Sequence, residues 1–299
     1  MAQQVVNGVF IGSIYALFAL GYTLVFGVLD ILNLAHQAVF MLCAFVALTL
    51  VESLHLHPLL SFPIAVAAGG AIGIALERVA FRPLRGRANS NIAGLISSIA
   101  VATIVEAVAL AAWGPDQQRF PFGMIPEAHA RALPGLQRAL GISVTVVQII
   151  IFAIALLVLA ALTVLVRRTR LGRQIRAVAE NPTAARILGV NVDRVIAAAF
   201  FVSSALGAAA GVLYGVAYNY VAPDMGRAVE LKGLAIIILG GMGSMPGAVI
   251  AAYVLALCEV WTVAAFGSSY RDVVSFAVLF LILLLRPRGL LGAAATREA

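Results

Sequence analysis

A short polar segment interrupts the apolar amino-terminal part of the chain and carries side chains that could do chemistry. The segment reads DILNLAHQ, and its polar residues are Asp30, Asn33, His36 and Gln37. Glu259 is a further carboxylate inside an apolar run, ~18 Å along a helix that starts at Gly247. Polar groups at membrane depth are costly, so they usually face the interior of a bundle or a water-filled path. These five residues therefore predict a solute path, in which a broken helix presents backbone groups to the solute.

Other interpretations of these side chains stay open from the residues alone. The DILNLAHQ segment also fits a short polar turn at the membrane surface, with a histidine whose hydrogen bonds are satisfied. Glu106 lies ~22 Å along a helix that starts near residue 91, which favours a place near the far interface. For Glu259, which lies deeper, we expect pairing inside the bundle.

The elements that must hold these side chains are apolar helices. The chain has 299 residues, of which 63% are hydrophobic and 11% charged, whereas a soluble domain is roughly 45–50% apolar and ~25% charged. The solvent is therefore a lipid bilayer, in which only helices and closed barrels satisfy the backbone. The runs lack the two-residue alternation of barrel strands. We predict an all-α integral membrane protein, a polytopic bundle with broken helices in a single domain over residues 1–299.

The apolar runs predict about eight or nine transmembrane helices. They cover residues 5–29, 31–51, 59–76, 91–112, 142–166, 195–217, 229–265 and 270–286. The run 229–265 is long enough for two passes, and a turn is predicted where it reads GGMGSMPG. The residues that favour this break are Gly240, Gly241, Gly243 and Pro246.

Small residues at four-residue spacing predict close contacts between helices. The clearest face consists of Gly207, Gly211 and Gly215 with Ser203. Gly8 and Gly12, and Gly69 and Gly73, repeat the spacing.

The distribution of positive charge predicts the orientation. Residues 77–90, residues 167–194 and the tail from Arg286 together carry 14 arginines, whereas the other side has six positive residues, Arg119, Arg131, Arg138, Arg227, Lys232 and Arg271. Positive residues accumulate on the cytoplasmic side of membrane proteins. Residues 167–194 should therefore be cytoplasmic, and residues 113–141 should form a periplasmic loop long enough to dock another protein. With nine crossings the amino terminus lies outside.

The cytoplasmic segment from Arg168 to Val190 reads RTRLGRQIRAVAENPTAARILGV and predicts two short helices. The first has an apolar face made of Leu171, Ile175 and Val178. Its charged side chains, which are free to meet another protein, are Arg173, Arg176 and Glu180. Asn181 suits the end of the first helix and the cap of the second, Pro182 a first helical position, and Gly189 a left-handed cap. A loop that only sets topology needs neither helix caps nor an apolar face. We therefore predict that this segment is a protein docking site.

This segment resembles the EAA-type coupling loop of ABC importer permeases, and in particular that of the high-affinity branched-chain amino-acid permease family. Residues 7–36, 238–250 and 270–292 are similar to other stretches of the same family, so the resemblance covers nearly the whole chain in order. It implies that the ATPase-coupling residues are Gly172, Arg173, Arg176, Ala179, Glu180, Asn181, Pro182, Ala185 and Gly189. The chain departs from the family at Gln37, where a glycine usually follows the histidine, and this leaves the exact substrate open.

The resemblance implies a permease subunit, not an enzyme, in a multi-pass position in the bacterial inner membrane. Its implied partners are two cytoplasmic ABC ATPases, a second related permease or a second copy of this chain, and a periplasmic substrate-binding protein. The chain has no G-x-x-x-x-G-K-[ST] phosphate loop, so ATP and Mg²⁺ should bind the partner ATPases. Its four histidines lack metal-ligand spacing, and no basic and aromatic platform suggests nucleic acid.

Three rival functions remain. An ABC permease for urea, short amides or aromatic acids would share the coupling loop. A secondary transporter driven by an ion gradient would use His36, Glu106 or Glu259 as a relay, although such folds often have two corresponding halves, which are not evident here. An intramembrane enzyme would use Asp30 and His36.

Overall fold

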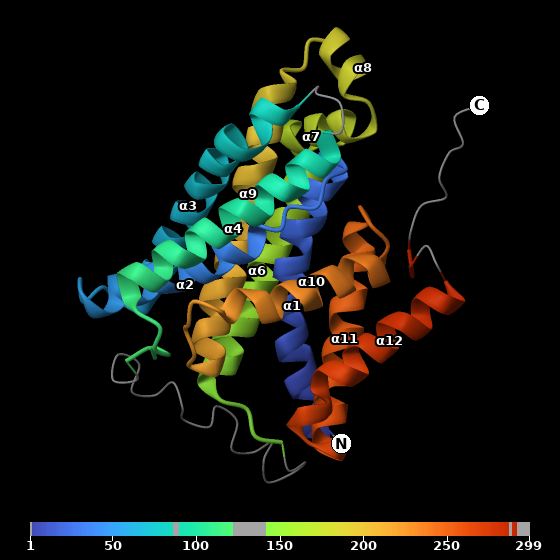
Figure 1. The fold of residues 1–299 in the computed structure, drawn as a ribbon. Helices are drawn as coiled ribbons and strands as arrows, with labels where there is room; N and C mark the ends of the chain where they lie inside the picture. Colours follow the sequence, from blue (N-terminus) through green and yellow to red (C-terminus); the bar gives the residue numbers. More distant parts are fainter. Residues whose placement is uncertain (1, 86–89, 122–141, 287–288, 292–299) are drawn as a thin grey trace.

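The computed structural model describes residues 2–85, 90–121, 142–286 and 289–291. Apart from an isolated bridge between Gln118 and Val221, their regular structure is helical, which confirms the all-α class. The α-helices are α1 (Ala2–Leu29), α2 (His36–Glu52), α3 (Pro58–Leu76), α4 (Ser90–Trp113), α6 (Val146–Arg168), α7 (Arg170–Glu180), α8 (Pro182–Ile187), α9 (Val192–Tyr218), α10 (Met225–Gly240), α11 (Met245–Phe266) and α12 (Arg271–Leu285) (Figure 1).

In the described part of the chain, seven helices are long and apolar enough to cross a membrane. They are α1, α3 with its continuation to Leu84, α4, α6, α9, α11 and α12 with the short turn before it. Helices α2 and α10 have only 17 and 16 residues, about 25 Å each, which is less than the ~30 Å hydrocarbon core. The predicted run 31–51 is shorter as a helix because residues 31–35 form a turn. Two of the predicted crossings are therefore short helices inside a polytopic bundle.

The two ends of the bundle are defined by contacts between distant segments. At one end, the Gln3 side chain donates to the carbonyl of Ser143 (3.1 Å), and the backbones of Gln118 and Val221 pair. At the other, the Arg85 guanidinium binds Asp193 (3.1 Å) in the first turn of α9, which follows α7 and α8 in the chain. Figure 1 shows α7 and α8 together at this end of the bundle. The regions 77–85 and 167–194 therefore share one end, opposite residues 113–121, as the charge distribution predicts. Residues 122–141, the rest of the expected docking loop, lie outside the described residues.

The predicted small-residue contacts are confirmed around α9. A Cβ on Gly207 would lie 2.7 Å from Cε1 of His36, and one on Gly211 would overlap the backbone carbonyl of Phe40 in α2. A Cβ on Gly73 of α3 would overlap the side chain of Ser204 on α9. A Cβ on Gly12 of α1 would likewise overlap the ring of Tyr253 on α11. Small residues let the backbones of neighbouring helices approach closely where lipid offers no hydrophobic driving force.

The Gly-rich stretch forms the predicted turn between α10 and α11. Gly241 and Gly243 adopt φ of 99° and 82°, a region that residues with a Cβ rarely enter. The Ser244 side chain then caps α11 by accepting a hydrogen bond from the Gly247 amide (3.3 Å), and Pro246 occupies the first turn. The sequence thus specifies locally where α10 ends and where α11 begins.

The contact between Gly211 and α2 predicts a difference between two glycine substitutions. Gly211→Ala should destabilise the protein by about 1–3 kcal/mol, because the new methyl group overlaps a backbone atom that cannot rotate away. Gly27→Ala in α1 is the matched control, since its Cβ would meet no atom within 4 Å. Thermal unfolding of the detergent-solubilised protein should show a lower midpoint for Gly211→Ala only. Equal midpoints would contradict the packing of α9 on α2.

Candidate functional site

The DILNLAHQ segment forms the turn between α1 and α2. Asp30 is exposed and ends α1 with a left-handed backbone (φ 54°). Asn33 is buried, and its side-chain oxygen accepts a hydrogen bond from the Ala35 amide (3.2 Å). This bond holds the turn that leads into α2, because an asparagine side chain can replace a backbone acceptor in this way.

His36 is enclosed by protein in this conformation. Its side chain is fully buried, and Nε2 lies 3.2 Å from the carbonyl oxygen of Phe18. The ring packs against Phe18 and Tyr22, with centroid distances of 4.8 Å and 5.4 Å. Its other nitrogen, Nδ1, has no hydrogen-bond partner in the part of the chain that the structure describes. A role for His36 in a solute path thus stays a prediction. The same holds for the predicted roles of Asp30 and Asn33.

Gln37 belongs to a polar network that links α2, α4 and α10. Its Nε2 donates to Oε1 of Glu106 (2.7 Å). The Arg227 guanidinium binds the same carboxylate through Nε (3.2 Å and 3.1 Å) and through its terminal nitrogen. Glu106 is therefore paired with a cation inside the bundle wall, and the expectation of a simple interfacial carboxylate missed both of its partners.

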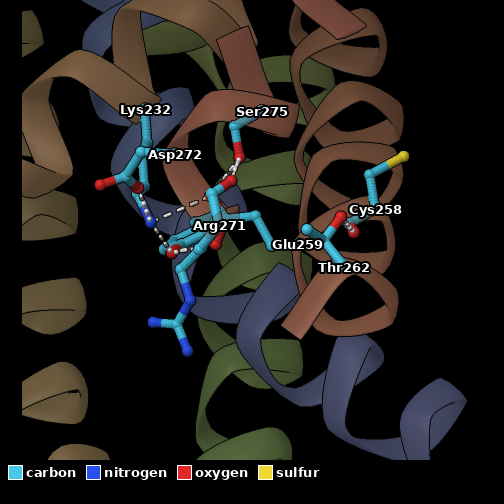
Figure 2. Close-up of polar contacts among 8 residues, drawn as sticks. Lys232, Cys258, Glu259, Thr262, Arg271, Asp272 and Ser275 are labelled. Carbon is cyan, nitrogen blue, oxygen red and sulfur yellow. Dashed lines mark hydrogen bonds and ion pairs between the residues drawn. The ribbon is translucent and has the colours of Figure 1, made fainter. Parts of the chain in front are cut away.

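Glu259 is the centre of a second network, which joins α1, α10, α11 and α12. Its carboxylate accepts hydrogen bonds from Tyr15 and Ser275 (3.0 Å each) and lies 3.0 Å from Nζ of Lys232. Figure 2 shows Lys232 between Glu259 and Asp272, whose Oδ1 is 3.4 Å from Nζ. The prediction that Glu259 pairs inside the bundle is confirmed. Whether it contributes to a solute path stays a prediction.

Both networks depend on α10, which runs obliquely across the bundle in front of α1 (Figure 1). Arg227 and Lys232 lie on this helix, whereas the sequence interpretation counts both among the positive residues on the far side of the membrane. The sequence does contain a signal that these two cations are paired. They lie in or next to the apolar stretch before the Gly-rich turn, where an unpaired charge would be costly. When these two residues are left out of the charge count, the far side has four positive residues against the 14 arginines of the other side.

The segment from Arg168 to Val190 forms the predicted pair of short helices. Ile175 and Val178 are buried, Leu171 is half-buried, and α7 rests on α1, α6 and α9. Arg173 and Glu180 are exposed as expected. Arg176 is exposed as well, and its guanidinium also donates to the carbonyl of Val166 at the end of α6, so its contact with another protein stays a prediction. The hydrogen bond to Val166 fastens α7 to α6.

Caps define the ends of α7 and α8 as predicted. The Asn181 side chain accepts a hydrogen bond from the Ala184 amide (2.9 Å), Pro182 begins α8, and Gly189 has φ of 83°. Ala185 is buried and Ala179 is exposed. At Gly172 a Cβ would overlap the last carbonyls of α6, so only glycine allows α7 to turn so sharply from α6. This part of the chain is thus a structured surface rather than a plain connector.

A cleft of about 420 Å³ separates α7 from the Gly-rich turn. Its lining residues are Thr23, Leu24, Gly27, Val28, Val166, Arg167, Ile175, Arg176, Ala179, Gly243, Ser244, Met245 and Pro246. The end of α1, helix α7 and the α10–α11 turn therefore face one another across a space into which α7 could move. Among the described residues there is no group of three or more histidine, cysteine or acidic side chains that could hold a metal ion.

Comparisons with known proteins cover almost the whole chain. A family described as branched-chain amino acid transport system / permease component matches residues 4–283. The chain is 37% identical to the high-affinity branched-chain amino acid transport system permease protein BraD of Pseudomonas aeruginosa, over 97% of this chain and 95% of that protein. It has the same identity and coverage to the permease protein LivH of Escherichia coli, and 28% identity to a probable LivH of Methanocaldococcus jannaschii. No solved structure matches the chain.

The burial of Glu259 predicts how the second network responds to substitution. Lys232→Met should destabilise the protein by about 3–5 kcal/mol, because it leaves a carboxylate of 2% exposure without its cation. Asp272→Asn, at a side chain that is 70% exposed, should cost no more than about 1 kcal/mol. Denaturation in detergent measures both. The double variant Lys232→Met/Glu259→Gln should recover much of the loss, and a double variant as unstable as Lys232→Met alone would contradict a charge-pairing role.

Proposed function

Because the chain belongs to the permease component family of branched-chain amino acid transport systems, we propose that it is the membrane-spanning permease subunit of an ABC importer for branched-chain or related amino acids. The observation that carries this proposal is the similarity to BraD and LivH over 97% of the chain, which includes both polar networks and the α7–α8 surface. The seven long apolar helices agree with a multi-pass membrane protein.

The proposed orientation puts α7 and α8 in the cytoplasm of a bacterial inner membrane, with residues 113–141 in the periplasm. Support comes from the 14 arginines in the segments at or near the α7–α8 end and in the tail. Positive residues are retained on the cytoplasmic side. In this orientation the α7–α8 surface is accessible to cytoplasmic ATPases, and the opposite end can receive amino acid from a periplasmic binding protein.

The α7–α8 surface has the properties that mechanical coupling requires. Its outer side exposes Arg173 and Glu180, and its inner side is attached by buried Ile175 and Val178 and by the Arg176 contact to α6. A rigid attachment lets a force on α7 move the ends of α1, α6 and α9 rather than bend the loop. Two partner ATPases that bind ATP and Mg²⁺ would change their contact with this surface in each cycle and bias the bundle between two conformations.

The proposal includes a second permease subunit, either a related chain or another copy of this one. Charged α10 side chains that are not covered within this chain favour such a neighbour or a water-filled path beside it, since Arg227 is 67% exposed. A path between two permeases would let the same coupling movement open and close both sides.

Uptake of amino acids by the complete complex tests this function. Proteoliposomes that contain this chain, its partner permease, the ATPases and the binding protein should accumulate labelled leucine, isoleucine and valine only when ATP is supplied. A protonophore should not change the rate, because the driving force is ATP rather than an ion gradient. Uptake driven by an imposed proton or sodium gradient without ATP would contradict the proposal. If the complex prefers urea, short amides or aromatic acids, the assignment to ABC importers stands. The assignment of branched-chain amino acids as the substrate is then wrong.

Substitutions on the α7–α8 surface test the coupling role. Glu180→Lys should reduce recovery of ATPase with the permease by about tenfold, the factor that ~1.4 kcal/mol of lost binding produces. Gly189→Val should act similarly without changing charge, because φ of 83° strains a β-branched residue. Glu52→Lys, an exposed charge reversal at the other end of the bundle, is the matched control. If both loop variants keep wild-type recovery and coupled uptake, this surface is not the coupling site.

A further inference from the structure

Three helices bring polar side chains together around the Glu106 carboxylate. Gln37 reaches it from the first turn of α2, and Arg227 from the first turn of α10. Glu106 itself is only 11% exposed, whereas the Arg227 side chain is 67% exposed. Gly226 permits this approach, because a Cβ there would overlap the side-chain oxygen of Gln37.

The cluster has more acceptors than it uses. Asp224 directly precedes α10, and Arg227 and Glu230 follow it at three-residue spacing on that helix. Asp224 already accepts a hydrogen bond from Tyr220 (3.0 Å), but Oε1 of Glu230 and Oε1 of Gln37 are buried without a partner among the described residues. Glu230 follows Arg227 on α10 by three residues, close to one helical turn. One cation is therefore surrounded by a surplus of negative and acceptor groups.

The exposed charge of Arg227 indicates a polar neighbour for this face of α10. Glu106, which Arg227 binds, lies seven residues before Trp113, the end of α4, about 10 Å along the helix. Charged groups in a membrane protein usually face water or other protein rather than hydrocarbon. We therefore expect this face of α10 to border a polar space, as a solute path would.

We propose that Gln37, Glu106, Arg227 and Glu230 form a binding subsite for the ammonium and carboxylate groups of a free amino acid. This assignment rests on the proposed importer function and specifies which side chains meet the substrate. The fork of Arg227, which now holds Glu106 through Nε and a terminal nitrogen, has the geometry that binds an α-carboxylate. The α-ammonium is then bound by Glu106, Glu230 and the unpartnered oxygen of Gln37.

Exchange of partners keeps Glu106 and Arg227 paired. In the empty subsite Arg227 neutralises Glu106, whereas Glu230 forms no ion pair with any described residue and is left for the substrate's ammonium. When the substrate enters, Arg227 moves to its carboxylate, and Glu106 receives its ammonium. A molecule that lacks either group leaves one of the two residues unpaired and is disfavoured. The subsite therefore selects for the amino-acid backbone and leaves the aliphatic side chain to other contacts.

Leucine uptake by the complete complex in proteoliposomes, with saturating binding protein and ATP, tests the subsite. Glu106→Gln and Arg227→Lys should each lower the maximal rate by about tenfold or more, as expected from loss of ~1.4 kcal/mol of interaction. Recovery of the ATPases with the variant permease should stay normal. Thr103→Val, one turn away on the exposed side of α4, is the matched control and should transport normally.

A charge swap separates substrate binding from a structural ion pair. Glu106→Arg/Arg227→Glu can rebuild the pair, but it places a cation beside the Gln37 amide donor and a carboxylate beside Glu230. Uptake should remain low. Rescue by the swap, or wild-type rates in both single variants, would overturn the subsite while leaving the importer function intact. If the wild-type complex takes up no amino acid at all, the proposed function fails, and the subsite fails with it.

Discussion

The carboxylates of Glu106 and Glu259 can remain inside the bundle because α10 brings a cation to each of them. Arg227 and Lys232 are separated by little more than one helical turn, yet they reach acids on α4 and α11. Without these cations the acids would be charged groups in surroundings that offer little water to solvate them. The oblique course of α10 across the bundle is what allows one short helix to serve both sites.

Glycine determines how closely the surrounding helices can approach this arrangement. Gly207 and Gly211 have no side chain and therefore let α9 pack directly on the start of α2. This packing encloses His36 and holds Gln37 within hydrogen-bond distance of Glu106. Gly233 similarly lets α10 lie on Phe18 of α1, so that Lys232 reaches Tyr15 and Glu259. Packing at the backbone thereby controls the position of polar side chains several ångströms away. A small change in helix approach would alter both networks.

The α7–α8 surface is placed to cause such a change. Its buried side rests on the ends of α1, α6 and α9, and α1 and α9 are the helices on which α2 and α10 pack. The cleft beside the Gly-rich turn leaves room for α7 to move toward the junction of α10 and α11. A displacement at α7 therefore has a continuous packed route to the polar networks.

The sequence by itself determined the features that depend on near neighbours. Apolar runs specified the long helices, and Asn181, Pro182 and Gly189 specified the ends of α7 and α8, because caps act within three or four residues. Only the tertiary structure decided which charges meet. Glu106 and Arg227 are 121 residues apart, and the apolar stretch around Lys232 indicates that such a cation needs a partner without identifying the partner. The burial of His36 and the attachment of Arg176 to α6 likewise follow from which helices pack together, and that choice belongs to the whole bundle.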